Sequence, residues 1–87
     1  MKSFSDLTEQ EIIALAISSE DDDARLYSGF ANALMEAYPA SAKVFMEMSE
    51  EEHQHRRWLT DLYQKKFGDF IPLIRPSDIN GFVKHRP

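Results

Sequence analysis

The chain has 87 residues, no cysteine, and 15 acidic residues against 10 Lys and Arg, which gives a net charge of −5. The acidic balance argues against nucleic acid or anionic lipid as a partner. The lack of cysteine excludes disulfides, iron–sulfur clusters and thiolate zinc sites. A metal would therefore need carboxylate and imidazole ligands, which suit iron, manganese or zinc. With no apolar leader and no run of ~20 apolar residues, we expect a cytoplasmic chain without membrane contact.

Two long helices are predicted in chain order. Thr8 and the glutamate three residues later form a capping box, and no proline follows until Pro39, so the first helix is predicted over residues 9–38. Pro39 suits the first turn of a second helix, predicted over residues 39–67 and ended by Gly68. Because the connection is so short, the two helices must form an antiparallel hairpin.

The remaining residues, 68–87, are punctuated by prolines and glycines but stay rich in apolar side chains. They are predicted to form an extended arm that packs on the rest of the chain, with a short helical turn after Ser77. The whole chain, residues 1–87, is interpreted as one all-α domain. A two-helix hairpin cannot cover its own apolar faces, so we expect at least a homodimer or further chain that supplies a second helical pair.

Polar residues interrupt two otherwise apolar seams. In steps of four and three the first helix presents Ile13, Ile17, Glu20, Ala24, Tyr27, Ala31, Leu34 and Tyr38, and the second presents Phe45, Met48, Glu52, His55, Leu59 and Leu62. Carboxylates on such seams are costly unless they are paired or coordinated. Counted from Pro39 at ~1.5 Å per residue, Glu20 lies within about one turn of the height of Glu52 and His55. The three are therefore predicted to be metal ligands of one site.

The same residues have other interpretations. Glu20 taken alone is also explained by a salt bridge to Arg56 or the arginine after it. The spacing of Glu52 and His55 recurs in Glu50-x-x-His53. This second pair is displaced by two residues and therefore rotated by about 200° around the helix axis relative to the first, so it should face outward. Asp23, three residues after Glu20, is interpreted as part of a solvated acidic surface, or else as a further metal ligand on a cation access route.

Three aromatic residues lie close to the predicted ligands in the sequence. Tyr27 shares the seam of Glu20, two turns further on. We interpret it as a core residue whose hydroxyl hydrogen-bonds a ligand carboxylate, with a catalytic redox role as the alternative. Phe30 and Trp58 are interpreted as core or interface residues.

The stretch SSEDDDARLYSGFA resembles the first ligand helix of rubrerythrin-like proteins, and Glu52-x-x-His55 followed by two arginines is similar to the second. FGDFIPLIRPSDINGFVKHRP resembles the N-terminal ferritin-like region of bacterial membrane-bound ferritins. In rubrerythrins a second helical pair follows in the same chain, whereas in encapsulated ferritins two copies of a single hairpin dimerise around the site. The resemblance thus implies a ferritin-like four-helix bundle, made by dimerisation or by a following helix pair.

The resemblance also implies a di-iron site with Glu52 bridging, Glu20 terminal and His55 on the outer position of each half. Such sites oxidise Fe(II) or reduce peroxide. Because a rubredoxin centre is absent, a ferroxidase or iron-homeostasis role is favoured over a peroxidase that needs an external electron donor. A non-catalytic helical dimerisation module is the third hypothesis. The expected partners are a second copy, a larger iron-handling assembly or an additional C-terminal domain.

Overall fold

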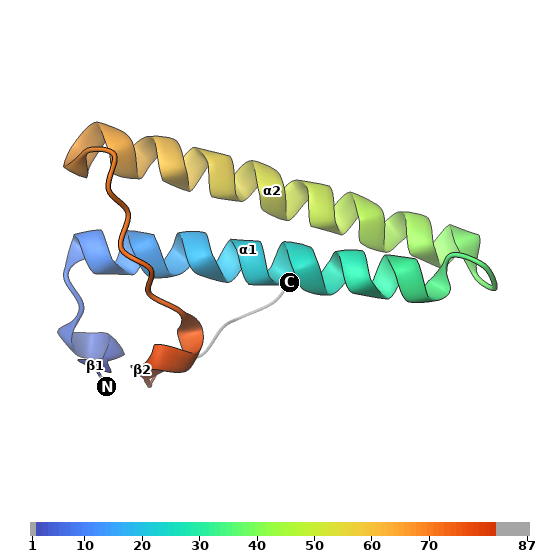
Figure 1. Cartoon of the computed structure of the whole chain (residues 1–87), viewed down its shortest axis with the longest axis horizontal. Coiled ribbons are helices and arrows are strands. Elements are labelled where there is room, and N and C mark those ends of the chain that lie inside the picture. Colours follow the sequence, from blue (N-terminus) through green and yellow to red (C-terminus); the bar gives the residue numbers. More distant parts are fainter. Residues whose placement is uncertain (1, 82–87) are drawn as a thin grey trace.

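Two long antiparallel helices make up most of the chain. The computed structural model describes residues 2–81, so the end of the predicted arm, residues 82–87, lies outside the described residues. Helix α1 spans Glu9–Leu34 and helix α2 spans Pro39–Phe67, and they lie side by side as a hairpin (Figure 1). The predicted all-α helical hairpin is confirmed.

Helix α1 begins where the capping box predicts and ends earlier than expected. The Thr8 hydroxyl accepts a hydrogen bond from the backbone N–H of Glu11, and the Glu11 carboxylate accepts one from the N–H of Thr8. The helix stops at Leu34 and not at residue 38, because a turn over residues 35–37 leads into Pro39. A proline disfavours helical geometry in the residue before it, and that residue, Tyr38, has φ −139° and ψ 64°.

Helix α2 has the predicted bounds. Pro39 occupies its first turn, where the missing N–H costs no helical hydrogen bond. At the other end Gly68 adopts φ 92°, a conformation that favours glycine, and its N–H donates to the carbonyl of Gln64. Lys65 and Lys66 lie in the last turn, where positive charge complements the helix dipole.

The arm after Gly68 closes one face of the hairpin. It crosses both helices near the end where they diverge (Figure 1). A buried cluster of Ala14, Ile17 and Tyr63 lies there, with Ile71 and Ile74 of the arm packed against it. The arm thus supplies the apolar cover that a third helix would otherwise give.

Short elements at the two ends of the chain hold the arm in place. The elements are β1 (Lys2–Ser3), the 3-10 helix η1 (Phe4–Asp6), the 3-10 helix η2 (Pro76–Asp78) and β2 (Ile79–Asn80). The two strands pair in parallel, with Lys2 opposite Ile79. The predicted turn near Ser77 is therefore present as η2. Over residues 2–81 neither helix is long and apolar enough to cross a membrane.

The two seams do not bury all their predicted residues. Leu59 is half-buried against the core cluster and Phe45 is half-buried nearer the hairpin turn. Leu62, in contrast, is 44% exposed, and Tyr38, beyond the end of α1, is 63% exposed. One edge of the helix pair is therefore left uncovered by the rest of the chain that the structure describes.

The core cluster gives a prediction about stability. Tyr63 is fully buried, and its hydroxyl accepts a hydrogen bond of 2.8 Å from the side-chain amide of Gln10. Tyr63→Ala should lower the free energy of unfolding by about 3–5 kcal/mol through the cavity it leaves. Tyr63→Phe, the matched control, should lose only about 1 kcal/mol for the hydrogen bond. Urea denaturation measures both, and equal losses would contradict this assignment of the core.

Candidate metal centre

The antiparallel register brings the predicted ligands to the same height. Glu20 lies 14 residues before Leu34, the last residue of α1, while Glu52 and His55 lie 13 and 16 residues after Pro39, the first residue of α2. The mismatch of about one turn in the prediction arose because the first helix was counted up to Pro39, although α1 ends at Leu34. One turn further along, the Ser49 hydroxyl donates a buried hydrogen bond of 2.9 Å to the carbonyl of Ala24, which fixes this register.

Glu20, Glu52 and His55 form one compact group between the helices. Each offers a ligand atom, and these atoms all lie within 4.8 Å of one another. The Nδ1 atom of His55 is 3.4 Å from Oε2 of Glu20 and 3.7 Å from Oε1 of Glu52. The side chain of Glu52 is 14% exposed, that of Glu20 22%, and that of His55 48%. The group is therefore deepest at Glu52 and opens to solvent at His55.

The environment of Glu52 strongly favours its protonated form. Burial, followed by the hydrogen bond with Glu20 and the negative charges of Glu20 and Asp23, raises the pKa of Glu52 from 4.5 to about 7. The nearby His55 opposes this shift but does not cancel it. Two carboxylates are thus held together where water cannot fully solvate them.

This donor set fits a divalent cation. Two carboxylates and one imidazole are the ligands that iron and manganese prefer, and zinc also accepts them. A cation between Glu20 and Glu52 would replace their repulsion with attraction, which offsets the cost reflected in the raised pKa of Glu52. The group offers three donors, half the number in the set of four glutamates and two histidines found in carboxylate-bridged bundles.

The other predicted site residues lie around this group. Asp23 is 6% exposed and so is not part of a solvated surface. It lies outside the compact group, although its charge contributes to the pKa of Glu52. Tyr27 is also buried and stacks on Phe45 with ring centroids 6.3 Å apart, which agrees with a core position. The roles of Asp23 as a ligand and of Tyr27 in catalysis stay predictions.

The second Glu-x-x-His does not join the centre. Glu50 is exposed and His53 is half-buried on another side of α2. Glu20, Glu52 and His55 are the only such three-residue group in the described part of the chain, so Glu50 and His53 take no part in another one. The outward direction predicted for this pair is therefore found for Glu50, whereas His53 is half-buried.

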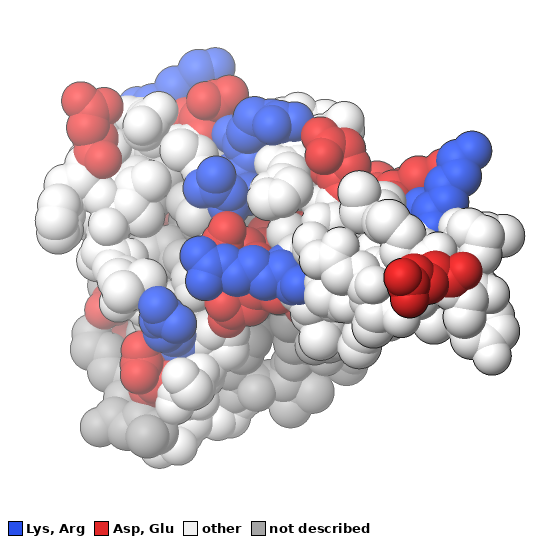
Figure 2. Space-filling model, turned by 45° about the vertical axis from the view of Figure 1, so that its right-hand side comes forward, with Lys and Arg blue, Asp and Glu red and all other residues white. Residues whose placement is uncertain are grey.

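An ion-pair network flanks the centre on the side of the arm. Asp21 forms an ion pair with Arg25 along α1, with Oδ2 3.3 Å from Nη2, and its Oδ1 lies 4.0 Å from Nε of Arg56 on α2. Arg56, which the sequence offered as a partner for Glu20, thus faces the neighbouring aspartate. Figure 2 shows acidic and basic side chains adjoining one another on the face drawn there.

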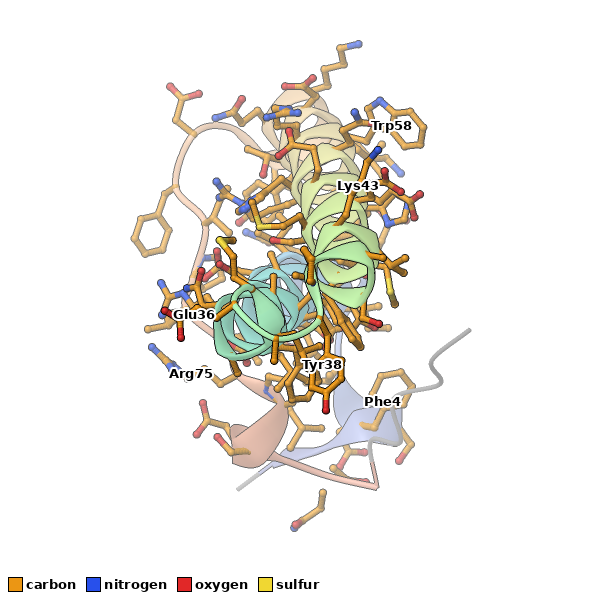
Figure 3. The ribbon with its side chains drawn as sticks, turned by 90° about the vertical axis from the view of Figure 1, so that its right-hand side faces the viewer. Phe4, Glu36, Tyr38, Lys43, Trp58 and Arg75 are labelled. Atoms are coloured by element: carbon orange, nitrogen blue, oxygen red, sulfur yellow. The ribbon has the colours of Figure 1, made fainter. Side chains whose placement is uncertain are left out.

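On the other side of the centre several large apolar residues are exposed. Val44 of α2 is 53% exposed, Trp58 70% and Leu62 44%, while Phe30 of α1 is 43% exposed. Val44, Trp58 and Leu62 follow the helical spacing of His55, so they share one side of α2. Figure 3 shows Trp58 projecting from α2 on the side away from Arg75 of the arm. We call this surface, made up of Phe30, Val44, Trp58 and Leu62 together with Glu20, Glu52 and His55, the open face.

The fold and the centre define a class of protein, a helical hairpin that brings together two carboxylates and an imidazole able to hold a metal ion. Comparison with sequence families agrees, because the rubrerythrin family model matches residues 11–87. The chain belongs to the rubrerythrin family, a ferritin-like family of di-iron proteins, which implies iron binding. Searches of curated proteins and of solved structures gave no match. The narrower resemblance to membrane-bound ferritins stays a prediction.

The raised pKa of Glu52 predicts how stability depends on pH. The folded chain holds this proton up to about pH 7 and the unfolded chain releases it near 4.5, so the metal-free protein should lose stability as pH rises through that window. Glu52→Gln keeps the shape of the protonated side chain and should remove the decline, gaining about 1–3 kcal/mol over the wild type at about pH 8. Denaturation in chelator-treated buffer measures the free energy of unfolding of both proteins across this pH range. If the two proteins show the same dependence on pH, the raised pKa does not belong to Glu52.

Proposed function

We propose that this protein oxidises Fe(II) at a carboxylate-bridged site formed between two copies of the chain. The observation that carries the proposal is the grouping of Glu20, Glu52 and His55 within 4.8 Å of one another at the solvent-facing edge of the hairpin. Membership of the rubrerythrin family supports iron as the metal. The position of the group supports a second copy as the partner, since three donors leave a metal pair half-coordinated.

A two-fold axis through the open face would complete the ligand set. The exposed apolar residues around the ligands would then become buried, which supplies the main favourable free energy of association. Near the hairpin turn, a shallow apolar hollow of about 300 Å³, lined by Phe30, Ala33, Leu34 and Phe45, extends the same surface.

The residues have distinct roles in this reaction. Two Fe(II) ions, the substrate, each give up one electron; dioxygen takes both electrons and two protons and becomes hydrogen peroxide. Glu52 and Glu20 balance the charge of the metal pair, which grows by one unit at each ion on oxidation. His55 must present the lone pair of Nδ1 to the metal, so it binds with its proton on Nε2.

The two Glu-x-x-His pairs supply a matched test of this site. Glu52→Ala should abolish Fe(II) binding, whereas Glu50→Ala should retain wild-type stoichiometry, because Glu50 is exposed and lies outside the group. Iron is added anaerobically and its content is measured by a colorimetric assay. The wild type should hold about one iron per chain, half of a two-metal site.

The chemistry is read out when the loaded protein meets air. A near-ultraviolet ferric band forming with dioxygen alone supports Fe(II) oxidation. A band that forms only with added peroxide would move the assignment to a peroxidase. No iron uptake by the wild type would overturn the metal site and leave a dimerisation module. Equal iron content in the two variants would show that Glu52 is not a ligand.

The proposed partner surface gives a separate prediction. Val44 on the open face and Met46 on another side of α2 are similarly exposed, at 53% and 48%. Val44→Glu should place a charge in the dimer interface and weaken association by at least about tenfold. Met46→Glu, the matched control, should leave association unchanged. Sedimentation velocity over a concentration series measures both, and a compact monomeric wild type at micromolar concentration would contradict the proposal.

A further inference from the structure

Trp58 lies beside the most exposed of the three ligands. It is the single tryptophan of the chain, and it is 70% exposed. Its ring centroid is 6.0 Å from that of His55, and the two ring planes are tilted by 38°. The two residues are three apart on α2, a spacing that places neighbouring side chains on one helical face. An exposed tryptophan is thus in ring contact with a ligand imidazole.

His55 needs a contact of this kind to hold its orientation. Its side chain is 48% exposed, and its Nδ1 atom faces Glu20 and Glu52 at 3.4 and 3.7 Å. Both distances are at or beyond the upper limit of a good hydrogen bond, so the carboxylates alone hold the ring weakly. Rotation about the side-chain torsions would turn Nδ1 away from the site. The indole of Trp58 lies beside the imidazole, with ring centroids 6.0 Å apart, and is placed to restrict such a rotation.

We propose that Trp58 is a positioning residue that keeps the imidazole of His55 directed at the metal site. This inference rests on the metal site of the proposed function and goes beyond it, because Trp58 itself contributes no ligand atom. Groups that orient a metal-binding histidine typically change metal affinity by ~10–100-fold when they are removed. Aromatic contact, and not hydrogen bonding, performs that task here.

Trp58 also lies on the open face, so its loss will weaken association as well as free His55. Leu62 separates the two effects. It is one turn further along α2, on the same face and 44% exposed, and it lies seven residues from His55. Leu62→Ala therefore removes apolar interface area and leaves the ring contact of His55 intact. Trp58→Phe keeps an aromatic ring at position 58 and tests whether such a ring is enough to maintain metal affinity.

The first measurement is the affinity of each protein for Co(II), determined by calorimetry and from the visible absorption of bound Co(II). All proteins are used at concentrations where sedimentation shows the same oligomeric state. Trp58→Ala should bind Co(II) ~10–100-fold more weakly than the wild type. Trp58→Phe should recover most of the affinity, and Leu62→Ala should remain within about threefold of the wild type, a loss of less than about 0.7 kcal/mol. Equal affinity of Trp58→Ala and Leu62→Ala would overturn the proposal.

The second measurement needs no metal. In the metal-free wild type, NMR couplings should report one side-chain rotamer for His55, with an Overhauser contact between its ring and the indole of Trp58. Trp58→Ala should give averaged couplings, whereas Leu62→Ala should not. Averaged couplings in the wild type would also overturn the proposal. If the wild type holds one rotamer but binds no metal, the proposed function fails while Trp58 still orients His55, so the two failures are distinguishable.

Discussion

The contact of Glu20 with Glu52 and His55 between two antiparallel helices is the constraint around which the candidate site is arranged. Two carboxylates held together at partial burial lose hydration and repel each other, which is why the pKa of Glu52 rises to about 7. A hairpin built for stability alone would place apolar residues at these seam positions. The antiparallel packing of the two helices keeps Glu20, Glu52 and His55 at the same height along the hairpin and at the edge of the molecule.

The arm makes the two faces of the hairpin unequal. On one face Ile71 and Ile74 pack on the core cluster, and the strand pair Lys2–Ser3 with Ile79–Asn80 ties the arm to the start of the chain. That face is closed by the chain itself. The other face carries Glu20, Glu52 and His55 and leaves Trp58 and its neighbours exposed. A partner that covered these exposed apolar residues would therefore also cover the carboxylate and imidazole group.

The sequence predicted the helices and the grouping of Glu20, Glu52 and His55 because both follow from periodicity. A capping box, a proline and a glycine mark three of the four helix ends, and carboxylates on an apolar seam stand out. The end of α1 was missed because no residue marks it, since Pro39 restricts its neighbour without fixing how long the turn is. The burial of Asp23 and the ring contact of Trp58 depend on three-dimensional packing, although the spacing of His55 and Trp58 would have indicated their proximity.

Metal binding and association are thermodynamically linked if the site lies between two copies. If the second copy raises the affinity for the metal by some factor, the metal raises the affinity between the two copies by the same factor. In a metal-free dimer the carboxylates of the second copy would add to the repulsion between Glu20 and Glu52, so the empty site would oppose the association that its apolar rim favours. A divalent cation bound between the carboxylates removes their repulsion. The free energy gained by burying the apolar residues then favours association without that opposing term. The same carboxylates that destabilise the empty hairpin would therefore make its assembly responsive to iron.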